Sequence, residues 1–233
     1  GYRFAPVADK VVRYGLGAIK GTGQGAIEAI LEARGSTPFV SLFEFAARVD
    51  RQRVNKRVVE ALIKAGAFDA LHGDRASALA SVTLAFDWAE AQEVNEHQGG
   101  LFDFADSHAA STQEPALVKA QAWSIKERLT AEKAALGFYL SGHLFEEYAP
   151  EVRRFVRKNI ADLVDSREPQ LLAGIVSDLR VVNGARGRQA IFRLDDGSEY
   201  IEAVAQEALY DAHRERLRDD ELVVIQGKVQ NDR

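Results

Sequence analysis

Lys20-Gly21-Thr22-Gly23-Gln24-Gly25 lies between two runs of residues whose apolar positions recur at helical spacing. Those positions are Val11, Val12, Leu16 and Ile19 before the stretch, and Ala26, Ile27, Ile30 and Leu31 after it. The second run closes at Arg34-Gly35, with a basic last turn and a glycine of the kind that ends helices. The sequence therefore predicts a helix, a tight glycine-rich turn and a second helix.

Glycine-rich turns of this length serve several kinds of site. A dinucleotide-binding turn follows a strand, whereas a helical pattern precedes this one. A Walker phosphate loop needs Gly-Lys-Ser/Thr after four spacer residues, which this stretch lacks. In a helix-hairpin-helix element, exposed backbone N–H groups at the start of the second helix hold a DNA phosphate, and Lys20 would add charge beside it. An ordinary helical hairpin that uses glycine only for its geometry explains the same spacing.

Two further helices are expected over residues 42–49 and 54–64. Ser41 precedes the first, with Glu44 placed three residues later as in a capping box. Basic residues gather around the second helix: Arg51, Arg53, Lys56, Arg57 and Lys64. A charge run of this kind is usually a solvated face. Beside a helix–glycine-turn unit, the same residues are candidates for contacts with DNA phosphates.

The middle of the chain carries the pentapeptide Gln98-Gly99-Gly100-Leu101-Phe102. A single helix is predicted over residues 75–95, a mobile linker over 103–122 and a further helix over 125–140, capped by Ser124. Leu101 and Phe102 have no periodic apolar partner in their own segment. They are explained either as a docking peptide that fills a pocket on another protein, or as side chains that fold back onto the domain.

Beyond Pro169 the apolar period changes from helical to alternating. Three strands over 172–182, 190–194 and 200–204, a helix over 207–218 and a strand over 222–229 form the pattern of an OB fold. An OB barrel needs five strands, so we expect the last strand to be truncated. Candidates for contact with single-stranded DNA are Arg186, Arg188, Phe192 and Tyr200. The same alternation also places Phe192 in the core.

Composition limits the function further. The chain has 233 residues, a formal net charge of −5 and no cysteine, which excludes disulfides and thiolate metal sites. Its five histidines are scattered without the spacing of metal ligands. Asp195-Asp196-Gly197 is the tightest acidic pair, and a hairpin turn explains it. We therefore expect no catalytic residue, no metal site and no cofactor in this chain, and no membrane span.

Several stretches together resemble one family. They are Tyr14-Gly15-Leu16-Gly17-Ala18-Ile19-Lys20-Gly21-Thr22-Gly23, Asn55-Lys56-Arg57-Val58, Leu62-Ile63-Lys64-Ala65-Gly66-Ala67-Phe68-Asp69 and Leu136-Gly137-Phe138-Tyr139-Leu140-Ser141-Gly142-His143. In this order they are similar to the alpha subunits of bacterial DNA polymerase III, the replicative C-family polymerases. The resemblance covers essentially the whole chain.

The resemblance implies a multidomain α + β chain with tandem helix-hairpin-helix elements and an OB-fold antiparallel barrel. Residues 1–10 would end the preceding fingers domain, 11–150 form the helix-hairpin-helix and clamp-binding domain, 151–168 a basic connector and 169–233 the OB domain. In the pentapeptide, Gln98 would enter a polar subsite of the sliding clamp, while Leu101 and Phe102 fill its hydrophobic pocket. The spacers Gly99 and Gly100 cost extra entropy to order and weaken that contact.

The resemblance also implies a parent enzyme, a cytoplasmic DNA-directed DNA polymerase whose Mg²⁺-binding carboxylates lie upstream. Its partners would be duplex DNA, the beta sliding clamp, other replisome subunits and, through the OB domain, single-stranded DNA. The alternative is a stand-alone DNA repair or scaffold protein with helix-hairpin-helix and OB modules.

Overall fold

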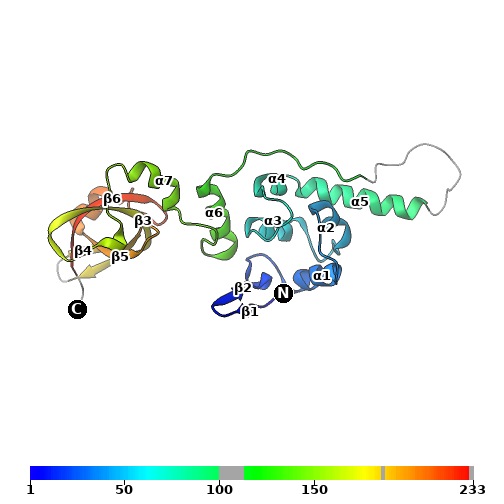
Figure 1. The fold of residues 1–233 in the computed structure, drawn as a ribbon, viewed down its shortest axis with the longest axis horizontal. Helices are drawn as coiled ribbons and strands as arrows, with labels where there is room; N and C mark the ends of the chain where they lie inside the picture. Colours follow the sequence, from blue (N-terminus) through cyan, green and yellow to red (C-terminus); the bar gives the residue numbers. More distant parts are fainter. Residues whose placement is uncertain (100–112, 185–186, 231–233) are drawn as a thin grey trace. The chain divides into compact units, whose positions relative to one another are not determined.

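The computed structural model describes residues 1–99, 113–184 and 187–230, with only the backbone helix described for 96–99. The chain forms two compact units, unit 1 (residues 1–140) and unit 2 (residues 141–233). Each unit has its own cluster of buried apolar side chains. Figure 1 shows helices and a small two-stranded hairpin in unit 1 and a twisted sheet in unit 2.

Unit 1 packs its helices around one apolar core, in which Phe43, Ile27 and Ile63 are almost fully buried. Its elements are β1 (Ala5–Ala8), β2 (Val11–Arg13), η1 (Leu16–Ala18), α1 (Gln24–Arg34), α2 (Leu42–Arg48), α3 (Lys56–Lys64), α4 (Arg75–Ala80), α5 (Val82–Gly99) and α6 (Ile125–Leu136). The expected caps are present at two helix starts. Ser41 accepts from the Glu44 amide, and Ser124 forms a full capping box with Glu127.

The helix expected before the glycine turn is wrong. Val11 and Val12 belong to β2, which pairs with β1 in an antiparallel hairpin, and only the single 3-10 turn η1 precedes Lys20. Lys10 reverses the chain at the hairpin tip with a φ of 58°. The valines therefore lie on a strand, which suits their β-branched side chains, and not on a helical stripe.

The single helix expected over residues 75–95 is also wrong, because it breaks at Ser81 into α4 and α5. The Ser81 hydroxyl donates to the Ser77 carbonyl at 2.7 Å and accepts from the Val118 amide at 2.8 Å. A serine that bonds back to the preceding turn bends a helix, and here it also takes a bond from a distant segment. Beyond the break, α5 continues past the predicted end to Gly99.

The predicted mobile linker, residues 103–122, is described only in part, because residues 103–112 lie outside the described residues. Residues 113–123 are held against unit 1 by specific contacts. This segment, the strap, runs without helix or strand along unit 1. It is held by the Ala120 amide, which donates to Ser77 at 3.1 Å, and by Glu114, which accepts from Ser41 at 2.8 Å. Leu117 packs against the core of unit 1. Composition missed the strap because its hydrogen-bond partners are serine hydroxyls, which leave no apolar pattern.

Unit 2 contains α7 (Phe145–Val152), η2 (Ile160–Asp162), β3 (Ser166–Gly184), β4 (Gly187–Asp195), β5 (Tyr200–Gln206), α8 (Glu207–His213) and β6 (Leu222–Val229). The described strands form one antiparallel sheet in the order β5-β4-β3-β6. The long strand β3 pairs with β6 through its first half and with β4 through its second. The strand pattern is confirmed. The expectation was an OB barrel with a truncated last strand, and the described strands of unit 2 form an open sheet.

The segment expected to be a basic connector, residues 151–168, is part of the fold of unit 2. It contains the end of α7, η2 and the first residues of β3. Ile160 is buried in the same apolar cluster as the sheet residues Leu172 and Phe192. Arg153 from this segment reaches the hairpin between β4 and β5. Its arginines therefore include at least one with a structural partner.

Candidate nucleic-acid interface

The glycine turn presents its backbone to solvent while one side chain holds it in shape. Lys20, Gly21, Gly23 and Gly25 are all exposed, but Thr22 is buried. The Thr22 hydroxyl lies 2.9 Å from the Leu16 carbonyl and 2.7 Å from the Ile19 carbonyl. Thr22 therefore fixes the turn from inside, and its side chain is not available to a ligand.

The glycines of the turn differ in what requires them. Gly21 has a backbone φ angle of 87°, which residues other than glycine rarely adopt. Gly23, the N-cap of α1, and Gly25, in its first turn, would each place a Cβ with no heavy atom within 4 Å. Packing within the chain does not require glycine at these two positions. Bare backbone there suits the close approach of a ligand.

The start of α1 is suited to an anion. The first amides of a helix have no partner within it. In α1 the Ile27 amide donates to the carbonyl of Gly23, the N-cap, so the amides without a partner in the helix are those that precede Ile27. The macrodipole adds positive potential at this end. A phosphate group that approached Gly23 and Gly25 would meet N–H donors and no side chain from either glycine.

Helix α6 supports the turn from behind. The Lys20 amide donates to the Ala135 carbonyl at 2.8 Å, so the residue before Gly21 is tied to the end of α6. α6 is held in turn by the fully buried Glu132, which accepts from Arg75 at 2.8 Å and from the Leu140 amide at 2.8 Å. A hydrogen bond with Asp69, at 2.6 Å, raises the pKa of Arg75. The sequence did not reveal this support, because Glu132 lies 57 residues from Arg75 along the chain, although Asp69 is only 6 residues away.

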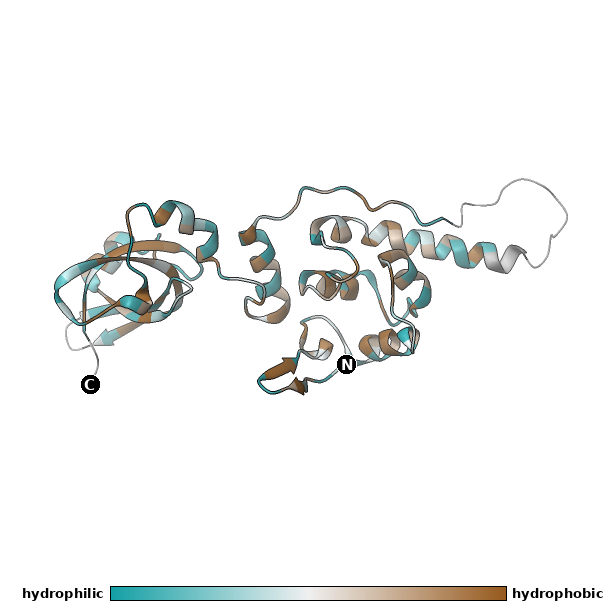
Figure 2. Ribbon diagram, in the orientation of Figure 1, coloured by the Kyte–Doolittle hydropathy of each residue, from teal (hydrophilic) through white to brown (hydrophobic). Residues whose placement is uncertain are grey.

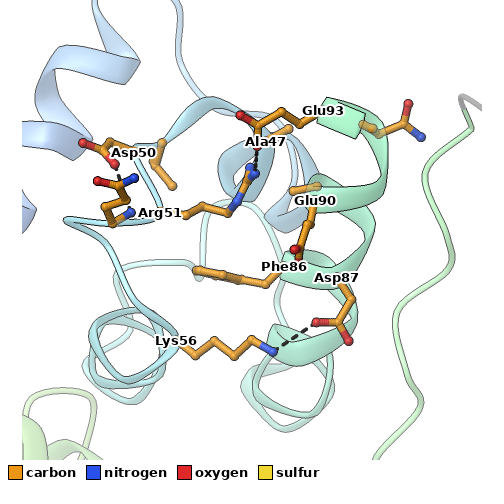
Figure 3. Close-up of a pocket in the computed structure, with 12 residues that line it drawn as sticks. Ala47, Asp50, Arg51, Lys56, Phe86, Asp87, Glu90 and Glu93 are labelled. Atoms are coloured by element: carbon orange, nitrogen blue, oxygen red, sulfur yellow. Dashed lines mark hydrogen bonds and ion pairs between the residues drawn. The ribbon is translucent and has the colours of Figure 1, made fainter. Parts of the chain in front are cut away.

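Most of the predicted DNA-contacting cations around α3 have carboxylate partners. Arg51 pairs with Glu93, Arg53 with Glu32 at 2.9 Å and Lys56 with Asp87 at 3.1 Å. Figure 3 shows Arg51 and Lys56 directed toward the helix that carries Asp87 and Glu93. These residues line a groove of about 700 Å³. Asp50 and Glu90 also line this groove. Acidic side chains thus outnumber basic ones here, and phosphate is not favoured.

The remaining two predicted cations lie elsewhere on α3. Arg57 is exposed, whereas Lys64 is partly buried, and the Lys64 carbonyl accepts from Arg75. The turn residues 20–25 therefore form one exposed site. The five predicted basic residues around α3 do not join them in a single positive patch without carboxylate partners.

The residues of unit 2 that were predicted to contact single-stranded DNA differ in burial and in ion pairing. Phe192 is only 4% exposed and belongs to the core, so its assignment as a stacking platform is wrong. Arg188 is ion-paired with Asp211, whose hydrogen bond raises the pKa of the guanidinium. Arg186 lies outside the described residues. Tyr200 is 49% exposed on the sheet, and the guanidinium of Arg193 lies 4.1 Å from its ring centroid.

Arg193 is a candidate that sequence reasoning missed. It lies opposite Glu202 in the β4–β5 register, and its guanidinium also lies 3.3 Å from Asp178. Alternation places Arg193 on the face opposite to Phe192. The signal was therefore present in the strand pattern that placed Phe192 in the core.

The pentapeptide lies at the end of α5 and partly outside the described residues. α5 carries its helix through Gln98 and Gly99, whereas Gly100, Leu101 and Phe102 lie outside the described residues. Figure 1 shows the end of α5 extending past α2. The strap begins at Gln113, so both described neighbours of this segment belong to unit 1.

The acidic pair in unit 2 has a structural use. The Asp196 carboxylate accepts from Arg153 at 2.7 Å and from the Ile160 amide at 3.0 Å. Asp195 accepts from the Gly197 amide within the hairpin turn and lies 3.2 Å from His143. Among the described residues, no group of three or more His, Asp or Glu side chains is arranged to hold a metal ion. None of the described helices combines the length and apolar character that crossing a membrane requires.

Comparisons with known proteins agree with this division of the chain. The family described as "Helix-hairpin-helix motif" matches residues 1–78, and "OB-fold nucleic acid binding domain" matches residues 171–233. DNA polymerase III subunit alpha of Neisseria meningitidis serogroup B is 40% identical over 99% of this chain. The subunits of Pseudomonas aeruginosa and Escherichia coli K12 are 39% and 34% identical over the same share. The chain spans about a fifth of the length of these curated relatives.

Proposed function

Because the chain is homologous over almost its whole length to one part of the DNA polymerase III alpha subunits, we propose that it holds duplex DNA for a replicative polymerase. The observation that carries this proposal is the bare backbone of the glycine turn at Gly23 and Gly25. In the parent enzyme, Mg²⁺-dependent nucleotide transfer would occur elsewhere. This part would keep the template–primer duplex in place.

The chemistry of the turn is independent of base sequence. Amide donors and a helix dipole recognise a phosphate, and every nucleotide carries the same phosphate. The exposed Lys20 adds charge at the edge of the same turn. The ion-paired residues Arg51, Arg53 and Lys56 contribute less than their number suggests, because a phosphate must displace a carboxylate from each. We therefore assign the main contact to the turn.

Salt dependence tests the proposal directly. We expect fluorescence anisotropy to show this chain binding a labelled duplex of random sequence. The affinity should fall by roughly tenfold or more between about 50 and 200 mM salt, because phosphate contacts release counterions. An adaptor that binds only proteins would show no binding to the duplex. Duplex binding that is insensitive to salt would also contradict the proposal.

The pentapeptide supports a second partner for the same part of the enzyme. We assign Gln98, Leu101 and Phe102 to a groove on the beta sliding clamp, with Gly99 and Gly100 as spacers. Burial of Leu101 and Phe102 is worth roughly 1.5–3 kcal/mol each. After ordering costs, this gives an isolated affinity in the micromolar range at best. Simultaneous binding to DNA raises the effective concentration and makes so weak a peptide useful.

Calorimetry against a purified clamp tests this second partner. Replacing Gln98, Leu101 and Phe102 by alanine should abolish clamp binding and leave duplex binding unchanged. The matched control is Val94→Ala, which removes an exposed apolar side chain from α5, the helix that leads into the pentapeptide. Unchanged clamp affinity in the triple variant would refute the assignment.

Tyr200 and Arg193 support a contact with single-stranded DNA on the face of the sheet. An exposed aromatic ring with a guanidinium beside it is a stacking platform of the kind that single strands use. Tyr200→Ala should weaken single-strand binding by about 1–3 kcal/mol. Phe155→Ala is the control, because it removes an exposed ring of unit 2 that lies outside the sheet. Equal affinities would exclude the platform.

A further inference from the structure

A run of basic residues lies between α7 and η2 in unit 2 and has no role in the sites described above. The run is Arg153-Arg154-Phe155-Val156-Arg157-Lys158, and it is called the basic loop here. The chain as a whole has 30 Lys and Arg residues and 35 Asp and Glu residues. The basic loop is therefore a local excess of positive charge in an acidic chain.

The fold of unit 2 fixes the backbone of the basic loop. Val156 is 1% exposed, and its amide donates to the last residue of α7 at 2.9 Å. Arg153 donates to the Lys158 carbonyl at 2.9 Å and to the buried Asp196 carboxylate at 2.7 Å. Ile160, just after the loop, is buried, and its amide also donates to Asp196. The loop is thus held at both ends and in its middle.

The remaining side chains of the basic loop face solvent. Figure 2 shows hydrophilic and hydrophobic residues mixed through α7 and the chain beside it. Arg154 and Arg157 are exposed, and within the described residues no ion pair or hydrogen bond engages either guanidinium. Lys158 donates to the neutral side-chain amide of Gln170 at 2.9 Å, which leaves its charge uncompensated. The loop therefore presents three cations that no described carboxylate neutralises.

The end of α7 explains only part of this charge. A helix C-terminus favours cations within its last turn, and Arg154 lies just beyond Val152, the last residue of α7. Arg157 and Lys158 lie farther along the chain, where that effect has decayed. A charge run is usually only a solvated face. Here, however, the backbone is fixed while both guanidiniums are unengaged, which suits a ligand that carries repeated negative charges.

We propose that the basic loop binds the phosphate backbone of DNA, as a contact separate from the glycine turn and from the Tyr200 ring. The inference rests on the proposed DNA-binding function. A guanidinium meets a phosphate through two parallel N–H donors, which makes arginine well suited to this ligand. DNA carries one negative charge per roughly 1.7 Å of duplex, so closely spaced cations can each meet a phosphate. The contact reads no base sequence, because every nucleotide carries the same phosphate.

The salt dependence of DNA binding tests the basic loop. Arg154→Gln with Arg157→Gln should lower DNA affinity by about fivefold or more at about 50 mM salt. It should also reduce the slope of log affinity against log salt by roughly 1 to 2, because two phosphate contacts are lost. The melting temperature should not change, since neither guanidinium has a described partner. Anisotropy titrations with a labelled duplex and with a labelled single strand show which form of DNA the loop contacts.

Two control variants isolate the effect of position. Arg214→Gln with Arg218→Gln removes the same charge from two exposed arginines between α8 and β6. This control should keep the affinity and the salt slope of the wild type. Phe155→Ala removes the uncharged ring of the loop, which is 56% exposed, and should also bind as the wild type does.

The proposal would be overturned by any of three outcomes. A wild-type salt slope in the Arg154 and Arg157 double variant would show that the loop contacts no phosphate, whereas failure of the proposed function would leave the wild type itself without DNA binding. An equal loss in the Arg214 and Arg218 control would show that only net charge matters. Binding of poly-L-glutamate that the loop variant loses, with DNA binding retained, would make the partner an acidic polypeptide.

Discussion

Asp196 joins three segments of unit 2 through one buried carboxylate, which accepts from Arg153, the Ile160 amide and Ser198. Asp196→Asn should destabilise unit 2 by about 3 kcal/mol, because it leaves Arg153 without its anion. Thermal unfolding measures this loss. Glu202→Gln is the control, because it breaks an exposed ion pair with Arg180 and should cost less than about 1 kcal/mol. Equal losses would show that burial of Asp196 is unimportant.

The same carboxylate predicts how stability depends on pH. Burial alone would raise the pKa of Asp196, but hydrogen bonds from Ser198, Arg153 and the Ile160 amide together lower it. A lowered folded pKa means that the stabilisation is complete above the unfolded value of about 4 and is lost as pH falls through the folded pKa. Acid titration of unit 2 should show this loss below about pH 4. In Asp196→Asn the corresponding part of the acid slope should be missing.

His72 predicts a second dependence on pH, at higher values and in unit 1. Its Nε2 accepts from the Leu42 amide at the start of α2, which requires the neutral ring. Burial lowers the pKa of His72, and Glu114 offsets this only in part. Stability from this contact is therefore complete above about pH 6.5 and falls as pH drops through the lower folded pKa. His72→Gln should flatten the stability of unit 1 between about pH 7 and 5, unlike the exposed His213→Gln control.

Residue types alone predicted the glycine-rich turn, because turn geometry follows from local pattern. The contact of Tyr200 with single-stranded DNA stays a prediction, for an exposed ring. Residue types did not identify Thr22 as a buried support, Arg193 as the neighbour of Tyr200 or Asp196 as an anchor. Each of these roles depends on a partner brought close by the fold. Ion pairing of Arg51, Arg53 and Lys56 likewise depends on helices that are distant in sequence.

At the scale of elements, the strap shows how hydroxyl groups can replace apolar packing. Ser77→Ala and Ser81→Ala each remove an acceptor for one strap amide, Ala120 and Val118 respectively. Each loss should cost about 1 kcal/mol and should speed exchange of the corresponding amide by roughly fivefold or more. The control is Ser36→Ala, which changes an exposed serine between α1 and α2. If exchange is as fast in the wild type, the strap is not docked in solution.

The predicted starts of α2 and α6 agree with the structure, because a capping serine precedes each helix. Boundaries that depend on contacts with distant segments were predicted wrongly. β4 ends in the Asp195-Asp196-Gly197 turn, as the hairpin signal predicts. The end of α6 was predicted wrongly, at residue 140, because the helix already stops at Leu136, before Gly137 with its φ of 93°. β2 and the break at Ser81 were missed because pairing with β1 and bonding to the strap overrode a helical period. Local propensity is a weak guide wherever such partners exist.

For the whole molecule, two cores predict two unfolding transitions. Glu132→Ala should lower the midpoint of unit 1 alone, because it removes one of the two carboxylates that pair with the buried Arg75, and Asp196→Asn should lower that of unit 2 alone. Each shift should be roughly 10–20 °C for units of this size. Calorimetric scans of both variants measure the shifts. A single transition that moves in both variants would show that the units unfold as one.

The central claim is that the bare backbone of the turn holds duplex DNA, and a double substitution tests it most directly. Gly23→Ala with Gly25→Ala fills open space and retains the fold, since alanine at position 25 favours the helix. Gly73→Ala is the matched control, because its Cβ also meets nothing within 4 Å. In anisotropy titrations at low salt, we expect the double variant to lose at least tenfold in duplex affinity, about 1.4 kcal/mol, with an unchanged melting temperature and an unchanged control. Duplex affinity equal to that of the wild type, in a folded double variant, would contradict the account.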